Sequence, residues 1–239
     1  MDWLRKAAEL NSHGASLVGS RNVKLALEYF RSSLDIVSLL AQGFTYCGQE
    51  PGAYGPTSNS SQSQLSLDLP SVSSFSSAAN QNEKPKARGD LEEAHQYLFL
   101  KALTFTADID DLSAEILSFC TAVVEFNIAL SFHMLSRRWG ERCLCKAVRV
   151  YDDCLAQLRR SACGLEACNT VLFAALNNKA AIYYEMSYFE RARDTLGCLL
   201  DAINKSRKQG SLAPVEDEAL EGFLFNILLL QGACIAPAA

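Results

Sequence analysis

The sequence has few of the residues that reactive sites and polyanion-binding surfaces require. Three histidines stand far apart among 239 residues, and the 13 glycines are dispersed, so no glycine-rich phosphate loop is present. No run of five basic residues occurs, and the formal net charge is −5. Sequence-independent binding to nucleic acid needs a basic surface, so the composition argues against nucleic acid as a partner. No nucleophile–base arrangement is visible either, and we predict that the chain is not an enzyme and needs no cofactor.

The nine cysteines do not have the spacing of a metal site. Cys143 and Cys145 are separated by one residue, and Cys163 and Cys168 by four, whereas structural zinc sites pair cysteines across two residues. We therefore predict no metal site and interpret the thiols as small buried hydrophobic side chains. Free thiols indicate a reducing compartment, with the cytoplasm as the default and the nucleus not excluded. Residues 1–14 lack the apolar core and cleavage site of a signal peptide.

Apolar residues at three- and four-residue steps predict helices over most of the chain. The most regular stretch, Leu176–Ile203, predicts an antiparallel helix pair with a tight turn at residues 186–188. Small residues, Ala180 and Ala192, stand where the two backbones would approach closely. The other predicted helices cover residues 2–40 (two helices with a turn at 19–22), 111–138, 144–158, 165–185 and 216–234, with a loop at 206–215.

Two segments interrupt this pattern. Residues 43–90 are dominated by Ser, Gln, Asn, Gly and Pro, and their scattered apolar residues cannot offset the entropy of ordering, so we predict a disordered loop. Residues 97–106 are almost continuously apolar and aromatic, which suits either a buried strand or a buried helix end. We predict an extended stretch there, with residues 44–47 as a pairing partner. Residues 1–42 and 91–239 would then form one continuous domain around the loop.

The helical segments contain a repeated spacing of small residues. Gly14 and Ala26 are twelve residues apart, as are Ala180 and Ala192, whereas Ala129 and Ala147 are eighteen apart. The longer spacing predicts a turn with six additional residues in the middle pair. This order of small and large residues resembles the tetratricopeptide repeat. The resemblance implies an all-α superhelix of about three helical hairpins (the first formed by residues 1–42), a C-terminal capping helix and the disordered insertion.

Asparagines occupy the same place in the first helices of the middle and third pairs and in the C-terminal capping helix. Asn127, Asn178 and Asn226 stand two residues before the small position or its equivalent, whereas Ser12 stands there in the first pair. The series resembles the asparagine ladder of some tetratricopeptide grooves, in which each amide pairs with a ligand's main chain without selecting its side chains. The alternative is that each asparagine caps or bridges adjacent helices internally. The groove neighbours implied by the resemblance are Phe126, Leu130, His133, Asn177, Ala181, Tyr184 and Phe225.

These patterns predict a scaffold or adaptor that binds a protein or peptide segment in the concave groove. An alternative rests on residues 222–239, an apolar tail of about the length of a short membrane span. Asn226 and Gln231 interrupt that tail, and the residues before it are acidic rather than basic. We therefore favour a buried capping helix over a tail-anchored adaptor, and consider a membrane an improbable partner.

Overall fold

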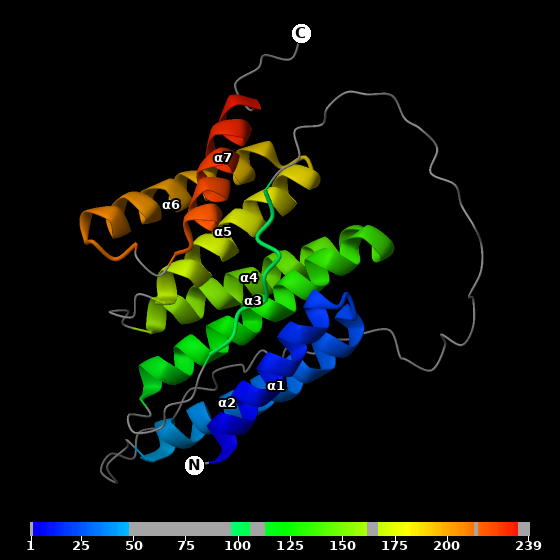
Figure 1. Ribbon diagram of the computed structural model, residues 1–239, viewed down its shortest axis with the longest axis vertical. Helices are drawn as coiled ribbons and strands as arrows, with labels where there is room; N and C mark the ends of the chain where they lie inside the picture. The colour runs from blue at the N-terminus through cyan, green and yellow to red at the C-terminus, as the bar shows by residue number, and fades with distance from the viewer. Residues whose placement is uncertain (1, 48–96, 106–112, 162–166, 213–214, 234–239) are drawn as a thin grey trace, which may run out of the picture. The chain divides into compact units, whose positions relative to one another are not determined.

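In the computed structural model, residues 2–47, 97–105, 113–161, 167–212 and 215–233 can be described, and they contain seven helices and no strand (Figure 1). The helices are α1 (Asp2–Gly19), α2 (Val23–Cys47), α3 (Ala114–Trp139), α4 (Glu141–Arg160), α5 (Ala167–Glu185), α6 (Phe189–Lys208) and α7 (Asp217–Ala233). All these residues belong to one compact unit, residues 1–49 and 95–239. The prediction of an all-α fold is therefore confirmed for the described chain. Of the predicted disordered loop, residues 43–47 are instead the end of α2, and residues 48–90 lie outside the described residues.

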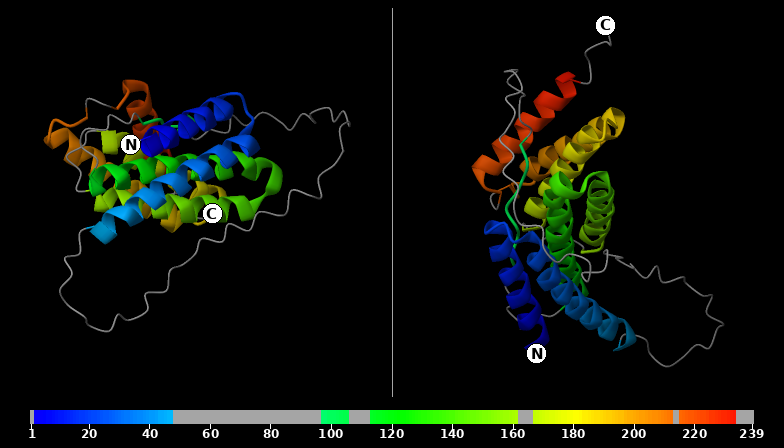
Figure 2. Two further views of the ribbon diagram at one scale, coloured as in Figure 1. Left: turned by 90° about the horizontal axis from the view of Figure 1, so that it is seen from below. Right: turned by 90° about the vertical axis from the view of Figure 1, so that its right-hand side faces the viewer.

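Consecutive helices pack as pairs, α1 with α2, α3 with α4, and α5 with α6. Neighbouring pairs meet through α2 and α3 and through α4 and α5, and α7 packs on α6. The first helices of the pairs also contact one another in order, α1 with α3, α3 with α5, and α5 with α7 (Figure 2). A surface formed by these four helices is thus available along the stack.

The turns of the first and third pairs have the same backbone hydrogen bonds. In the α1–α2 turn, the N–H of Asn22 donates to the carbonyl of Leu17 (2.8 Å), and in the α5–α6 turn the N–H of Tyr188 donates to that of Tyr183 (2.8 Å). Arg21 and Ser187 occupy the equivalent position in these turns and both have a positive φ, 62° and 61°. Both residues lie seven positions after the small residue of their first helix. The repeat is therefore one of backbone conformation as well as of side-chain size.

The middle pair differs, and here the prediction of a turn with six additional residues is wrong. Gly140 alone separates α3 from α4, and its φ of 75° suits a residue without a Cβ. The additional residues instead lengthen the two helices, because nothing before Gly140 interrupts the helical pattern. The predicted pairing of residues 44–47 with residues 97–106 is also wrong, since residues 44–47 are the last residues of α2.

Small residues lie where the helices are closest. Ala26, Ala147 and Ala192 are fully buried, and a Cβ on Gly14 would lie 2.5 Å from the Phe30 ring. Phe189 is 47% exposed at the start of α6, although it follows the apolar spacing from which these helices were predicted. Four described cysteines are buried and act as small core residues (Cys120, Cys143, Cys154 and Cys168), whereas Cys145 and Cys198 are exposed.

One described helix, α3, is long and apolar enough to cross a membrane by length and composition. Within its most apolar window, 78% of the residues are buried inside the protein, as expected of a central core helix. The apolar tail at residues 222–239 is described only as far as the end of α7 at Ala233. The preference for a buried capping helix over membrane attachment through that tail therefore stays a prediction.

Candidate functional site

Residues 97–105 run as a non-helical, extended segment across the first helices of the stack (Figures 1 and 2). We call them segment 97–105. The segment contacts residues from α7 at its beginning and from α3 and α1 near its end. The predicted extended stretch is thus confirmed for residues 97–105, while Thr106 lies outside the described part.

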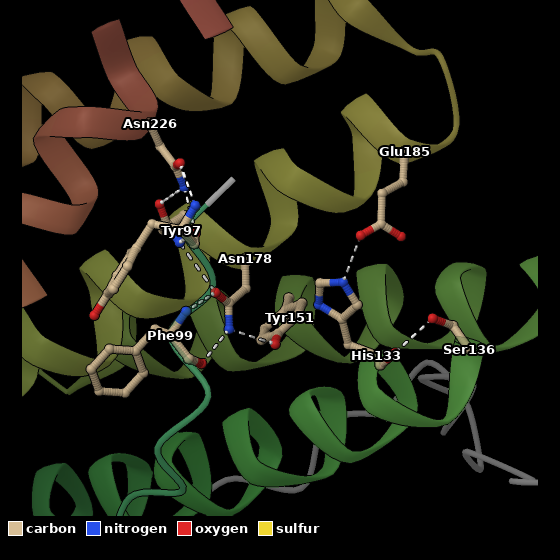
Figure 3. Close-up of polar contacts among 9 residues, drawn as sticks. Tyr97, Phe99, His133, Ser136, Tyr151, Asn178, Glu185 and Asn226 are labelled. Atoms are coloured by element: carbon tan, nitrogen blue, oxygen red, sulfur yellow. Dashed lines mark hydrogen bonds and ion pairs between the residues drawn. The ribbon is translucent and has the colours of Figure 1, made fainter. Parts of the chain in front are cut away.

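Three asparagines each bind both backbone polar groups of one residue in segment 97–105. Asn226 Oδ1 accepts from the N–H of Tyr97 (2.8 Å), and its Nδ2 donates to the Tyr97 carbonyl (2.5 Å). Asn178 pairs in the same way with Phe99 (both distances 2.9 Å; Figure 3). Asn127 pairs with Leu103 (2.8 and 2.7 Å). In an extended chain the N–H and C=O of one residue point to the same side, so a single carboxamide can satisfy both.

Two further asparagines complete this set. Asn11 of α1 donates to the Leu103 carbonyl (2.9 Å) and accepts from Asn127 Nδ2 (2.8 Å). Asn177 donates to the Tyr97 carbonyl (3.1 Å) and accepts from Asn226 Nδ2 (2.8 Å). We call Asn11, Asn127, Asn177, Asn178 and Asn226 the asparagine row. Its members therefore bind a segment of the same chain and also bridge neighbouring helices. Binding of a separate ligand's main chain by these amides stays a prediction.

All five asparagines are fully buried, which makes these contacts energetically important. A buried amide without partners costs several times the net gain of one hydrogen bond. Segment 97–105 supplies those partners, and Tyr151 supplies another through its hydroxyl, 3.2 Å from Asn178 Nδ2. Burial also raises the pKa of Tyr151, so this phenol stays neutral at physiological pH.

Aromatic side chains of the segment fill a cluster beneath the asparagine row. Phe99 is 4% exposed, and its ring centroid lies 6.1 Å from that of Phe126 and 5.9 Å from that of Phe223. The Tyr97 ring packs edge-on against Phe223 at 5.8 Å. Burial raises the pKa of Tyr97, and the negative charges of Glu218 and Glu216 add to this effect. The amides thus bind the backbone of the segment, while Phe126 and Phe223 pack against its aromatic side chains.

The structure brings some of the predicted neighbours to the segment and places others elsewhere. Phe126 contacts Phe99, Asn177 contacts Tyr97, and Leu130 and Ala181 are buried in the core. Tyr184 packs instead on Phe189, with centroids 5.3 Å apart.

Phe225 differs most from its predicted place, because it is 48% exposed on α7. Phe126 and Phe225 each precede an asparagine of the row, but Phe126 lies in the buried middle of α3, whereas α7, the last described helix, has a solvent face. Phe223, three residues before Asn226, takes the inward position. Asn11 was missed because Ser12 occupies the place that matches Asn127. Asn11 matches Asn177 instead, because each stands three residues before the small residue of its helix.

His133 lies beside the segment rather than in the asparagine row. Its Nε2 lies 3.4 Å from Glu185 Oε1, and its backbone carbonyl accepts from Ser136 Oγ (2.6 Å; Figure 3). Among the residues that can be described, no three His, Cys, Asp or Glu side chains gather as metal ligands. The absence of a metal, of a cofactor and of catalysis stays a prediction.

The extended segment, its asparagine row and the aromatic cluster together form the candidate functional site. No protein-family model matches the chain, and no curated protein or solved structure matches it significantly.

Proposed function

We propose that the chain is a non-catalytic scaffold of tetratricopeptide-like helical hairpins whose asparagine row binds extended protein segments. In this proposal, segment 97–105 is an internal occupant of the groove, and a partner segment binds by replacing it. The observation that carries the proposal is the set of three two-bond pairs between single carboxamides and single residues of an extended backbone.

The chemistry of these pairs supports exchange between segments. A carboxamide binds the N–H and C=O that every residue except proline presents, so the row does not require the sequence of segment 97–105. Selectivity would come from the pockets of Phe99 and Tyr97, which favour an aromatic side chain at alternate positions. A suitable partner is therefore an extended protein segment with two aromatic residues separated by one residue.

Covalent attachment sets how strongly a partner must compete. A tethered segment has an effective concentration on the order of millimolar, so a free segment of equal intrinsic affinity would occupy few molecules at micromolar concentration. A partner would need higher affinity, or a change that weakens the internal segment. The groove is then closed by default and opens to selected partners.

The repeated features of the helices support the tetratricopeptide-like part of the proposal. The first and third pairs share a turn with the same hydrogen bonds and the same positive-φ residue. Their small residues are buried at the same spacing. The amides all come from the first helix of a pair or from α7, which is the helix set that forms the groove in that family.

The test is binding of a labelled peptide with the sequence of residues 97–105, flanked by lysines for solubility, to Phe99→Ala protein. Truncating this buried ring should weaken binding of segment 97–105 to the groove by about 3 kcal/mol. The ratio of bound to released segment would then fall more than a hundredfold. The peptide retains the phenylalanine and should bind the variant with micromolar affinity, measured by fluorescence anisotropy, but should not bind wild-type protein detectably. Adding Asn178→Ala should abolish that binding.

Phe225→Ala is the matched control, because it removes an aromatic ring of the same size from the exposed face of α7. That variant should behave like wild-type protein. If Phe99→Ala protein keeps its helical circular dichroism and still fails to bind the peptide, segment 97–105 is a permanent part of the core and the proposal is wrong. Loss of the helical signal in Phe99→Ala would contradict it equally, since an exchangeable segment cannot be required for the helices.

A further inference from the structure

A cleft of about 710 Å³ lies beside segment 97–105, on the side away from the aromatic cluster. Leu98 and Leu100 of the segment form part of its wall. The α1–α2 turn and the start of α2 contribute Arg21 and Lys24, and the last turn of α3 contributes Arg137 and Arg138.

The charge of this cleft is opposite to that of the whole chain. Four basic side chains line it against one carboxylate, Glu185, although the chain has a formal net charge of −5. Within the described residues, Arg21, Arg137 and Arg138 have no ion-pair partner, and Lys24 Nζ lies 4.8 Å from the centroid of the Trp139 ring. Three arginines gathered here without ion-pair partners among the described residues raise the local potential and favour binding of an anion.

Two features of the wall reinforce this preference. Helix α2, whose first residues line the cleft, has no acidic residue in its first turn to balance the positive end of its dipole. The His133 side chain also lines the cleft and is 5% exposed, and its Nδ1 is buried without a hydrogen-bond partner in the described structure. A buried polar atom without a hydrogen-bond partner is costly. A ligand whose binding turns the His133 ring so that Nδ1 gains a partner would therefore be favoured.

The cleft also has an apolar side. Leu100 of the segment is 49% exposed, and Leu98, Val23 and Leu135 line the same space. The basic residues come from two separate elements, the beginning of α2 and the end of α3. Charges spread in this way suit several carboxylates placed around an apolar residue better than one compact phosphoryl group.

We infer that this cleft binds an acidic protein segment, in which Asp or Glu side chains pair with Arg21, Lys24, Arg137 and Arg138 while an apolar residue packs on Leu98 and Leu100. This site does not depend on exchange in the asparagine row. Its wall includes segment 97–105, so it exists while that segment is bound. Occupation of the cleft should therefore hold the segment in place and oppose its replacement by a partner.

The test uses full-length wild-type protein and a fluorescein-labelled acidic peptide, EDLEDLED, with its neutral analogue QNLQNLQN. The acidic peptide should bind at least tenfold more tightly than the neutral one, and its affinity should fall as salt is raised. Arg137→Ala with Arg138→Ala should weaken its binding at least tenfold. Leu100→Asp, which adds a negative charge to the wall, should do the same.

Arg142→Ala with Arg159→Ala is the charge-matched control, because both arginines are exposed on α4 and outside the cleft. Equal weakening by the two double variants would mean that the peptide follows overall charge, and the inference would fail. Absence of binding, or equal binding of both peptides, would overturn it as well. Tighter binding of a singly phosphorylated neutral peptide than of EDLEDLED would show that the cleft is a phosphoryl site and would replace the acidic-segment assignment.

Discussion

The helix pairs and segment 97–105 both contribute buried side chains to this protein, but different contacts stabilise them. Between paired helices, small residues such as Ala192 allow close approach, and the helices satisfy their own backbone hydrogen bonds. Segment 97–105 is neither helical nor part of a sheet. Side-chain amides form hydrogen bonds with its backbone at Tyr97, Phe99 and Leu103 instead. The helix pairs are therefore specified by side-chain size, whereas the segment is specified by amides placed on four different helices.

This difference predicts different responses to mutation. Changes between helices should affect the stability of the whole unit, while changes at the segment should affect its occupancy and leave the helices folded. Three substitutions test the distinction, in decreasing order of expected effect.

The largest effect is expected from Ala192→Glu. Ala192 is fully buried between α5 and α6, so the variant would place a carboxylate in an apolar contact with no compensating charge. We expect a loss of more than about 4 kcal/mol and the disappearance of cooperative unfolding in circular dichroism. Ala114→Glu, at the exposed start of α3, is the control and should unfold like wild-type protein. A folded Ala192→Glu protein would show that the helix contact is looser than described.

A smaller effect, dependent on pH, is expected from Glu125→Gln in the α3–α4 pair. Burial and the charge of Asp153 raise the pKa of Glu125 to about 8, although Arg160 opposes the shift. Glu125 Oε2 and Asp153 Oδ2 are both buried without hydrogen-bond partners in the described structure. The folded-state pKa lies above the ordinary 4.5. The contribution of this carboxyl group to the free energy of unfolding is therefore fully present below about pH 4.5 and is lost as the pH rises toward 8.

Glutamine is neutral at every pH, so Glu125→Gln should remove most of this dependence. At pH 8 the variant should exceed wild-type protein by on the order of 3 kcal/mol in urea unfolding, with little difference at pH 5. Glu28→Gln changes an exposed carboxylate of α2 and should leave the pH profile unchanged. A wild-type protein that is more stable at pH 8 than at pH 5 would contradict the assignment.

The smallest effect, and the most local, is expected from Gly222→Ala. A Cβ on Gly222 would lie 2.5 Å from atoms of the Tyr97 ring, so the ring and the Asn226–Tyr97 pair must shift. Alanine also favours helix over glycine by about 1 kcal/mol. We expect an unchanged or slightly higher melting temperature together with roughly tenfold faster hydrogen exchange at the Tyr97 amide.

Gly197→Ala separates the two consequences of that substitution. Gly197 lies within α6, and a Cβ there would have no neighbour within 4 Å. It should show the gain in helix stability without faster exchange at Tyr97. If both variants leave exchange at Tyr97 unchanged, the contact between Gly222 and the Tyr97 ring does not govern how firmly the segment is bound.

Much of the helical architecture could be predicted from the sequence, because helix pairing depends on local periodicity and on side-chain size. The turns at residues 19–22 and 186–188, the small residues between helices and the non-helical stretch after residue 96 all left such local signals. The middle turn was mispredicted because spacing counts residues without showing whether they extend a helix or a loop. Phe225 was mispredicted because a terminal helix has a solvent face that the sequence motif does not reveal.

The sequence alone determined that asparagines stand at matching places in successive helices and that an apolar stretch without helical periodicity occurs elsewhere in the chain. Only the tertiary structure decided that these two features belong together, since Asn226 and Tyr97 are 129 residues apart and share a two-bond pair. A side-chain amide can form hydrogen bonds with the backbone of almost any residue, so its presence in the sequence does not indicate which segment it binds. The folded arrangement of four helices decided it, by placing five buried amides along one extended segment, where they bind the backbone of Tyr97, Phe99 and Leu103.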